Sequence, residues 1–432
     1  MSGLARLLAE SGHSVSGSDE KDSPAVQNLL KEGIPVDIGH KAENLPAAAE
    51  LLVYSPAVDD GNSERIEAGK RGLRQLSYPQ AIGMVTENFE TISICGTHGK
   101  TTVTGMGAAA LVKAKADPTV IVGATTKELG GRNERLGGGP YFLIESCEYR
   151  RGFLNYNPKV IIITNIELDH LDYYKNLEDY VKAFREYIEK LPPNGLLIAN
   201  SDDKNVQTII KDFTNCPVIT FGTSKTADYR LAESSVMHEG EVLAEFKLLI
   251  PGIHNQMNAT AVIALCYELG IDMVSAIDAL NSFSGAGRRC EEKGKIGNTI
   301  ILDDYGHHPT EITATLKAVR EKYGSDKKIL CIFQPHQYSR TLKLLPAFAR
   351  AFSDADQVII PNILRARDSD AEVKAITPQG LVQEIAKFNK NVSYENGLEN
   401  TAVAAKKLAP QFDVIITMGA GDVYKIADAL LS

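Results

Sequence analysis

The amino-acid sequence predicts an α/β fold of three domains, each built around a sheet whose strands are largely parallel. Short apolar runs rich in β-branched residues alternate with helical stretches along most of the chain, a pattern typical of doubly wound sheets. The length of 432 residues indicates two to four domains at roughly 100–200 residues each. Hydrophobic residues make up 44% of the chain, which is enough for several cores and excludes a disordered or fibrous protein.

The first domain is expected at residues 1–86. A helical pattern over residues 1–12 precedes an expected strand at residues 13–17, and a second apolar strand is expected at residues 50–55. Asp19 would end a strand at the place where dinucleotide-binding folds often bind a ribose. Such a β-α-β unit begins with a strand and a Gly-rich turn that this sequence lacks. We therefore expect a reading frame that begins upstream of Met1, with a truncated chain as the alternative.

The second and third domains are expected at residues 87–288 and 289–432. In the second, strands rich in β-branched and other apolar residues are predicted to begin at Thr91, Tyr141, Val160 and Leu196. In the third, strand and helix alternate, and continuous apolar strands are predicted to begin at Thr299, Ile329, Val358 and Val414. These runs have the composition of strands buried on both faces of a parallel sheet.

The segment of residues 96–102, Gly-Thr-His-Gly-Lys-Thr-Thr, lies between a β run and an Ala-rich helical stretch, as a phosphate-binding loop does. Backbone N–H groups at such a helix start bind phosphate oxygens. Lys100 would neutralise the β- and γ-phosphates of ATP, and the Thr101 hydroxyl would ligate Mg²⁺. The alternative is a glycine turn that only caps a helix. The residues assigned to ATP here are Gly96, Thr97, His98, Gly99, Lys100, Thr101 and Thr102.

Polar loops after two further strands of the same domain are expected beside this loop, because the carboxyl ends of parallel strands share one sheet edge. Glu145 lies where the apolar strand gives way to polar residues, a position that suits a carboxylate holding a metal ion opposite the γ-phosphate. His170 would complete a second metal site, for which Mn²⁺ is better suited than Mg²⁺, or it is a surface residue. Asp169 and Asp172 are either part of this site or helix caps. The predicted metal ligands are Thr101, Glu145 and His170.

Charge, cysteines and apolar runs exclude several classes of function. Lys and Arg total 46 against 55 Asp and Glu, and a net charge of −9 opposes broad affinity for nucleic acid or anionic membranes. The six cysteines form no Cys-x-x-Cys pair, which argues against a zinc ribbon or a disulfide framework. No apolar run reaches the roughly 18–20 residues of a membrane span, and no signal peptide is evident. We expect a cytoplasmic protein without membrane insertion.

The ordered set of motifs resembles the Mur ligases, ATP-dependent amide-forming enzymes of peptidoglycan synthesis, and most closely the alanine-adding members. The resemblance implies an incomplete Rossmann-like N-terminal domain, a central P-loop ATPase-like domain and a doubly wound Rossmann-like C-terminal domain. It extends over nearly the whole chain. The motifs that carry it are residues 96–102, 145–151, 164–170, 251–259, 287–289, 303–309, 333–341 and 419–422.

The resemblance implies ATP and Mg²⁺ as cofactors, UDP-N-acetylmuramate and L-alanine as substrates, and a monomer or homodimer. Asn255 and Asn258 would lie near the adenine, although both residues also fit a helix start. Arg289 and Asp304 would reach the nucleotide from across a domain junction. Residues that would bind the substrates are Ser18, Asp19, Ser55, Tyr305, His336 and Arg340. Catalytic roles are implied for Lys100, Glu145, His170, His336 and Arg340.

Three alternatives stay open at the level of sequence. A family member that recycles a murein tripeptide shares the phosphate loop, although the motifs at residues 149–151, 304–306 and 336–338 favour the alanine-adding type. Gln337 stands where many of the alanine-adding enzymes have Arg, which would leave more of the phosphate binding to Arg340 and Lys100. A kinase or a nucleotide-binding protein without ligase activity would also need the phosphate loop. The adjacent residues His307 and His308 could suggest a zinc cluster, but consecutive side chains at a strand end diverge.

Overall fold

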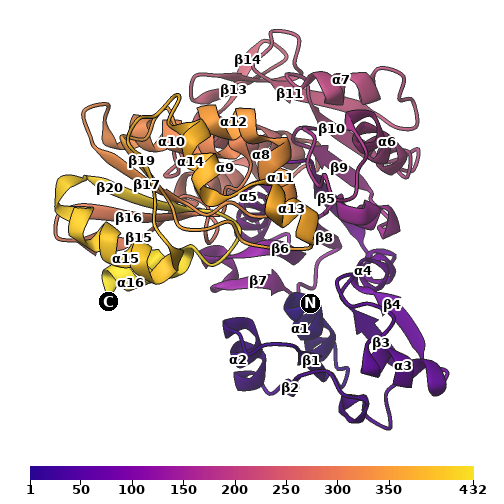
Figure 1. Ribbon diagram of the computed structural model, residues 1–432. Helices are drawn as coiled ribbons and strands as arrows, with labels where there is room; N and C mark the ends of the chain where they lie inside the picture. Colours follow the sequence, from indigo (N-terminus) through magenta and orange to yellow (C-terminus); the bar gives the residue numbers. More distant parts are fainter.

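The computed structural model describes residues 1–432, and the chain folds into three successive α/β domains. Figure 1 shows the first domain, in indigo and violet, below the other two, with the orange and yellow C-terminal domain beside the middle one. No strand pairs with a strand of another domain. No helix has both the length and the hydropathy that a membrane span requires.

The first domain consists of two separate parallel strand pairs, β1 with β2 and β3 with β4, and four helices. The predicted position of its first strand, residues 13–17, is wrong. The ladder begins only at Gly17, which pairs with Val36, because residues 13–16 have no neighbouring strand. The elements are α1 (Ser2–Glu10), β1 (Gly17–Asp19), α2 (Pro24–Lys31), β2 (Val36–Ile38), η1 (Ala42–Asn44), β3 (Leu51–Tyr54), α3 (Ser63–Lys70), β4 (Arg74–Ser77) and α4 (Tyr78–Thr86).

The middle domain is built on a ten-stranded sheet of order β14-β13-β12-β11-β10-β9-β5-β8-β6-β7. Its first half contains β5 (Glu90–Cys95), α5 (Lys100–Lys113), β6 (Thr119–Thr126), η2 (Lys127–Leu129), β7 (Arg132–Arg135), β8 (Tyr141–Glu145), η3 (Tyr149–Asn155) and β9 (Val160–Ile163). Its second half contains α6 (Leu177–Ile188), β10 (Leu196–Asn200), α7 (Lys204–Ile210), β11 (Val218–Gly222), β12 (Tyr229–Ala232), β13 (Ser235–His238), β14 (Glu241–Glu245), α8 (Ile253–Glu268) and α9 (Met273–Ser282).

Two apolar cores cover the faces of this sheet. Helices α5, α8 and α9 pack on one face, and α4, α6 and α7 pack on the other. Helix α5 is buried on nearly all sides. Its small residues let it approach the sheet closely, since a Cβ at Gly107 would lie only 3.3 Å from the Leu143 side chain. The central position of β5 places the start of α5 at the middle of the sheet edge.

The antiparallel edges of the middle sheet were not predicted from sequence. Strands β12, β13 and β14 form a meander at one edge, and β7 pairs with β6 at the other. The β7 segment reads Arg-Asn-Glu-Arg, and no apolar run marks it. Edge strands need only one buried face, which explains why their sequence signal is weak.

The C-terminal domain is doubly wound, with a six-stranded sheet of order β15-β16-β20-β17-β18-β19 in which only β15 is antiparallel. Helices α10, α12 and α14 cover one face, and α15 and α16 cover the other. The elements are β15 (Glu291–Ile296), β16 (Thr299–Asp304), α10 (Pro309–Tyr323), β17 (Ile329–Phe333), α11 (Tyr338–Lys343), α12 (Leu345–Arg350), β18 (Gln357–Ile360), α13 (Asp370–Ala375), α14 (Pro378–Ile385), β19 (Val392–Tyr394), α15 (Gly397–Leu408), η4 (Ala409–Gln411), β20 (Val414–Met418) and α16 (Tyr424–Leu431).

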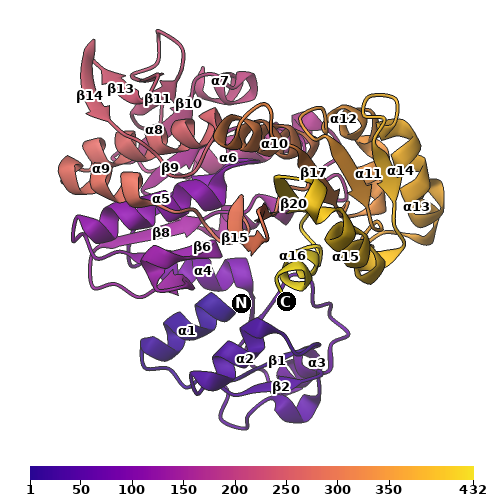
Figure 2. The ribbon, with the colours of Figure 1, turned by 90° about the vertical axis from the view of Figure 1, so that its left-hand side faces the viewer.

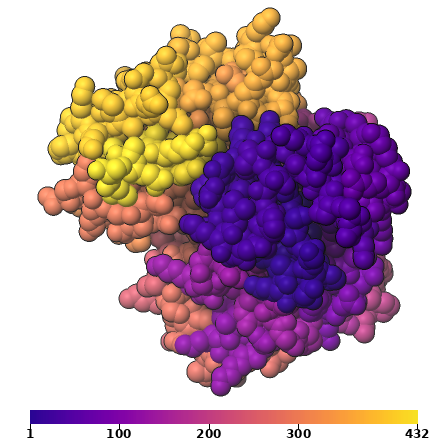
Figure 3. Space-filling view, turned by 90° about the horizontal axis from the view of Figure 1, so that it is seen from below, coloured from indigo at the N-terminus to yellow at the C-terminus, as the bar shows by residue number.

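The first domain contacts the lower face of the middle domain, as Figures 2 and 3 show. Arg6 of α1 is buried and bonds both Glu32 of its own domain and Glu134 of β7, with Nη1 3.3 Å from Oε2 of Glu134. A second contact joins the guanidinium of Arg150 to the carbonyl of Pro56 at 3.1 Å. The second contact lies next to Ser55, so the loop after β3 faces the middle domain.

Candidate active site

The phosphate-binding motif forms the loop between β5 and α5. Gly96 has a φ of 134°, and Gly99, which caps α5, has a φ of 83°. A Cβ at Gly96 would lie 2.1 Å from Oγ1 of Thr164, and one at Gly99 would lie 2.8 Å from Oδ1 of Asn258. Both positions therefore require glycine. No side chain caps the start of α5, so its first backbone N–H groups are free to bind phosphate oxygens.

Lys100 forms a buried ion pair at the mouth of this loop. Its Nζ lies 3.1 Å from Oε2 of Glu148 and donates hydrogen bonds to the carbonyls of Gly96 and Thr97. Burial acts to lower the pKa of Lys100, but the Glu148 carboxylate outweighs it and raises that pKa. Burial likewise acts to raise the pKa of Glu148, but Lys100 lowers it to about 2. Both groups are therefore charged at neutral pH.

Thr101 and Glu145 provide two oxygen ligands beside the loop. The Thr101 hydroxyl donates to Oε1 of Glu145 at 3.0 Å, and the backbone N–H of Gly123 donates to Oε2 of Glu145 at 2.7 Å. Arg289, which precedes β15, donates to the Thr101 hydroxyl at 3.2 Å from across the domain junction. Hydroxyl and carboxylate oxygens are the donors that Mg²⁺ prefers, so the side chains present here fit such an ion.

The structure places His170 against Glu148, a residue that sequence reasoning did not select. Nε2 of His170 lies 3.6 Å from Oε1 of Glu148, and the two residues with Cys147 offer donor atoms within 4.8 Å of one another. Burial acts to lower the pKa of His170, but Cys147 and Glu148 raise it to about 10. Glu148 lies three residues after Glu145 in the same polar loop. This position in the sequence is the signal that could have identified it as a second acidic residue of the site.

Arg340 crosses from the C-terminal domain to the middle domain. Its Nε and Nη2 donate to Oδ1 of Asp169 at 3.0 and 2.8 Å, and both side chains are buried. Nη1 of Arg340 lies 3.3 Å from Nδ1 of His336, and burial together with this guanidinium lowers the pKa of His336 to about 4. His307 lies 3.9 Å from Asp169. The predicted residues Arg340 and His336 therefore meet the middle domain at the loop that follows β9.

The residues expected near the nucleotide lie at the start of α8 and the end of β16. Asn255 donates to the carbonyl of Pro251 at 2.6 Å, and Asn258 donates to Oδ1 of Asn255 at 3.3 Å. Asp304 accepts from the backbone N–H groups of Cys290 and Gly306, both at 2.7 Å. Burial raises the pKa of Asp304 to about 6, although Arg289 opposes this shift. The ring of Tyr305 lies 5.1 Å from the Arg289 guanidinium.

A network of charged residues joins the phosphate loop to α10. Nε2 of His98 lies 3.0 Å from Oε2 of Glu167, and Nδ1 of His98 lies 3.1 Å from Oε1 of Glu311. Thr310 donates to Oε1 of Glu167 at 2.8 Å, and Glu311 also accepts from the backbone N–H of His308 at 3.2 Å. Burial acts to lower the pKa of His98, but the two carboxylates raise it to about 9. Sequence reasoning placed His98 at the nucleotide and did not select either carboxylate.

The residues expected at the UDP-sugar lie in the first domain, on two different strand pairs. The Ser18 hydroxyl on β1 donates to Oε2 of Glu64 at 2.8 Å and lies 2.9 Å from Nδ1 of His40. Asp19 accepts from the N–H of Lys21 at 3.1 Å. Ser55 follows β3. The strands β1 and β3 belong to separate pairs, so strand pairing does not bring Ser18 and Asp19 next to Ser55.

Backbone strain gathers around the candidate site. His170, Arg150, Arg151, Gln337 and Arg288 all have φ between 50° and 74°, a region that residues other than glycine seldom adopt. All five lie in loops or short turns near the domain junctions. His170 directly follows Asp169, and Gln337 precedes Arg340 by three residues. Strained backbone persists where surrounding contacts determine it, and it is frequent at functional sites.

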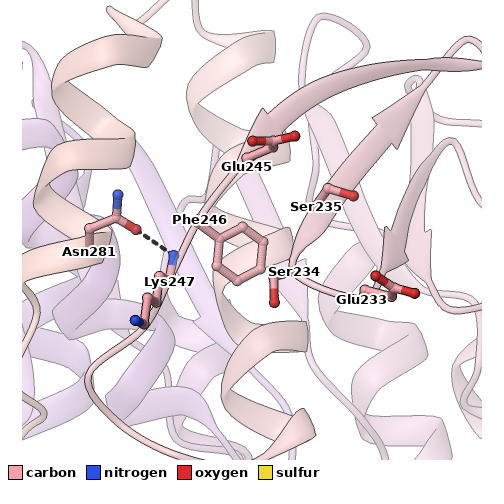
Figure 4. Close-up of a pocket in the computed structure, with 7 residues that line it drawn as sticks. All are labelled: Glu233, Ser234, Ser235, Glu245, Phe246, Lys247 and Asn281. Carbon is pink, nitrogen blue, oxygen red and sulfur yellow. Dashed lines mark hydrogen bonds between the residues drawn. The ribbon is translucent and has the colours of Figure 1, made fainter.

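Two hollows contain none of the ion-paired residues described above, although Thr310 lines the second. One of about 400 Å³, drawn in Figure 4, is formed by β13, β14 and the end of α9, where the N–H of Lys247 donates to Oδ1 of Asn281 at 2.7 Å. It is open and holds few groups that converge on a ligand. The other, of about 600 Å³, lies between the start of α8 and helices α10 and α12, with His254 and Lys317 among its lining residues. The second hollow lies along the junction of the middle and C-terminal domains.

The fold and the site define a three-domain α/β protein in which the middle and C-terminal domains meet at one charged centre around a phosphate loop. Residues 1–90 match the Mur ligase family catalytic domain, residues 94–266 the Mur ligase middle domain, and residues 288–421 the Mur ligase glutamate ligase domain. The chain therefore belongs to the Mur ligase family. This result confirms the family, fold class and three-domain architecture expected from sequence.

Similar proteins share the whole length of the chain. The UDP-N-acetylmuramate–L-alanine ligase of Acetivibrio thermocellus is 40% identical, over all of this chain and 93% of its own length. The protein of the same name from Caldanaerobacter subterraneus subsp. tengcongensis is 37% identical, over 100% and 95%. The crystal structure of UDP-N-acetylmuramate–alanine ligase from Thermotoga maritima, 28% identical, superposes with a TM-score of 0.82 and covers 100% of this chain and 95% of its own.

Proposed function

We propose that this chain is a UDP-N-acetylmuramate–L-alanine ligase, which couples the conversion of ATP to ADP and phosphate with formation of an amide bond. The single observation that carries the proposal is the full-length identity of 40% to a protein of that name. The phosphate loop supports it, because Lys100 pairs with Glu148 and the Thr101 hydroxyl bonds Glu145 beside it. Its setting would be peptidoglycan precursor synthesis in the cytoplasm.

A carboxylate is a poor electrophile, so the proposed route activates it by phosphoryl transfer to form an acyl phosphate, which the amine of L-alanine then attacks. The γ-phosphoryl group would lie between the N–H groups of α5 and the ammonium of Lys100. Thr101 and Glu145 would hold Mg²⁺, with His170 and Glu148 near a second cation, for which Mn²⁺ is also suited. A bound divalent cation would neutralise charge on the phosphates.

The residues of the C-terminal domain would complete this centre. Arg340 is positioned by Asp169 to face the middle domain, and its charge would stabilise a transferring phosphoryl group. His336 has a pKa of about 4 because of burial and the neighbouring Arg340, so it is neutral at pH 7 and would contact the amino acid as an uncharged hydrogen-bonding group. Contacts between the two domains would also exclude water from a hydrolysable acyl phosphate.

The test is release of phosphate from ATP that requires both UDP-N-acetylmuramate and L-alanine. Release with a murein tripeptide in place of L-alanine would favour the recycling ligase, and release without any amino acid or peptide would favour a kinase or a simple nucleotide hydrolase. We expect Lys100→Ala to lower the rate at least a hundredfold, because an ammonium that neutralises phosphate is lost. Lys113→Ala, at the exposed end of α5, is the control and should stay within twofold. A Lys100→Ala rate within tenfold of wild type would refute the phosphate-loop assignment.

A further inference from the structure

The side chains of His98, Glu167 and His308 form a cluster that the proposed reaction does not use. One potential ligand atom from each lies within 4.8 Å of the others. His98 belongs to the phosphate loop, Glu167 to the loop after β9, and His308 caps α10. The cluster therefore spans the junction between the middle and C-terminal domains. The rings of His98 and His308 have centroids 4.9 Å apart.

His308 is the observation that points to a ligand. Its side chain is 4% exposed, and its Nε2 has no hydrogen-bond partner. A buried polar nitrogen without a partner is costly, and such groups in native structures usually have a functional or bound-ion explanation. Nδ1 of His308 is held by a long bond of 3.4 Å from the N–H of Thr310, which fixes the ring at the start of α10.

The other two side chains are already oriented as metal ligands usually are. Nδ1 of His98 bonds the Glu311 carboxylate at 3.1 Å, which leaves Nε2 facing Glu167 at 3.0 Å. A histidine that shares one ring nitrogen with a carboxylate and turns the other toward a cation is the common arrangement around zinc. Thr310 holds the far oxygen of Glu167 at 2.8 Å.

We propose that His98, Glu167 and His308 bind a divalent transition-metal cation of the zinc class, separate from the Mg²⁺ expected at Thr101 and Glu145. Two imidazoles and one carboxylate suit Zn²⁺ or Co²⁺ and disfavour Mg²⁺. Ligand bonds of about 2.1 Å in a tetrahedral site need donors about 3.4 Å apart. The distance from Nε2 of His98 to Oε2 of Glu167 is 3.0 Å, and Nδ1 of His308 lies 3.9 Å from the same oxygen, so both distances are close to this spacing. Glu167 is 43% exposed, which leaves a path for the ion and a water ligand.

Such a cation would connect two domains that must separate to exchange nucleotide, if the proposed function is correct. His98 and Glu167 lie in the middle domain, and His308 lies in the C-terminal domain. A bound cation would stabilise the closed arrangement by an amount that grows with the cation concentration relative to its Kd. The site would thus make the protein sensitive to the free concentration of an imidazole-preferring metal.

The experiment titrates the full chain with Co²⁺, without nucleotide or Mg²⁺, and follows the visible absorption of tetrahedral Co²⁺ and the thermal unfolding midpoint. We expect one site that raises the midpoint and that is at least tenfold weaker in both His308→Gln and Glu167→Gln. Glu167→Gln serves as the second variant because Glu167 is partly exposed and caps no helix. His238→Gln, in β13 and bonded only to the carbonyl of Asp228, is the matched control and should bind as wild type.

Cys147→Ser separates this site from the other group of three potential ligands, Cys147, Glu148 and His170. Unchanged binding in Cys147→Ser together with loss in His308→Gln supports the proposal. Loss only in Cys147→Ser, or affinity within threefold of wild type in both His308→Gln and Glu167→Gln, overturns it. The readout involves no ligase turnover, so failure here leaves the proposed function intact. Failure of the phosphate-release assay likewise leaves the metal site intact.

Discussion

His98 and Glu311 are 213 residues apart in the chain and meet at 3.1 Å, Nδ1 to Oε1, across the junction of the middle and C-terminal domains. His98 lies within the phosphate loop, and Glu311 lies in the first turn of α10. Glu311 also caps that helix by accepting from the backbone N–H groups of His307 and His308. One carboxylate therefore links the geometry of the phosphate loop to the position of a whole helix.

Replacing Glu311 by Gln should lower kcat/KM for phosphate release by roughly 10- to 100-fold, because losing a hydrogen bond to a charged group costs about 1.5–3 kcal/mol. The measurement is steady-state release of phosphate with all three substrates. Glu321→Gln, on the exposed face of the same helix, is the matched control and should remain within twofold. A Glu311→Gln enzyme with wild-type kcat/KM would show that the contact has no role in turnover.

The pH dependence of stability should show the charge on His98. Its pKa is raised from 6.5 to about 9 in the folded chain, so it contributes stability fully below pH 6.5 and loses it as the pH rises through about 9. The gap in thermal unfolding midpoint between wild type and His98→Gln, measured with EDTA, should therefore be widest near pH 6 and narrow toward pH 10. A gap that stays constant over this range would contradict the assignment.

Arg340→Lys should lower kcat/KM at least tenfold although the positive charge remains. Arg340 uses two N–H groups on one oxygen of Asp169, a fork that lysine cannot reproduce. The same steady-state assay measures the effect, and Asp169→Asn should give a loss of similar size. Arg71→Lys, whose partner Glu67 lies on the surface of the first domain, is the control. Equal activity of Arg340→Lys and Arg71→Lys would exclude a positioning role for the fork.

Phe153→Ala should destabilise the middle domain by about 3–5 kcal/mol, the usual cost of removing a buried aromatic side chain. Phe153 is fully buried in η3, stacks on Tyr187 with ring centroids 4.3 Å apart, and meets Phe184 edge to face. Calorimetric unfolding measures the change. Phe388→Ala, at a side chain that is 51% exposed, should alter the midpoint far less. Equal shifts for the two variants would mean that the Phe153 cluster does not stabilise the domain.

Several features follow from sequence alone because they depend on short segments. The β run, the glycines at 96 and 99 and the helix after them predict a phosphate loop, since strand propensity, left-handed backbone and helix start are local properties. The structure shows this loop with φ values that require glycine at both positions. Sheet order also makes neighbours of loops that follow parallel strands, so the meeting of Thr101 and Glu145 was predictable.

Only the tertiary structure decided which side chains complete the site. Glu148, Glu167 and Glu311 are unremarkable in sequence, and each becomes important because folding places it beside a cation or imidazole from a distant segment. The first strand begins at Gly17, later than the sequence predicted, because pairing with Val36 and not local propensity determines where a strand begins. Sequence therefore determined the family, the phosphate loop and the strands with two buried faces. Burial and long-range pairing, which no short segment encodes, determined which charged residues meet at the domain junction and which strands form the edges of the middle sheet.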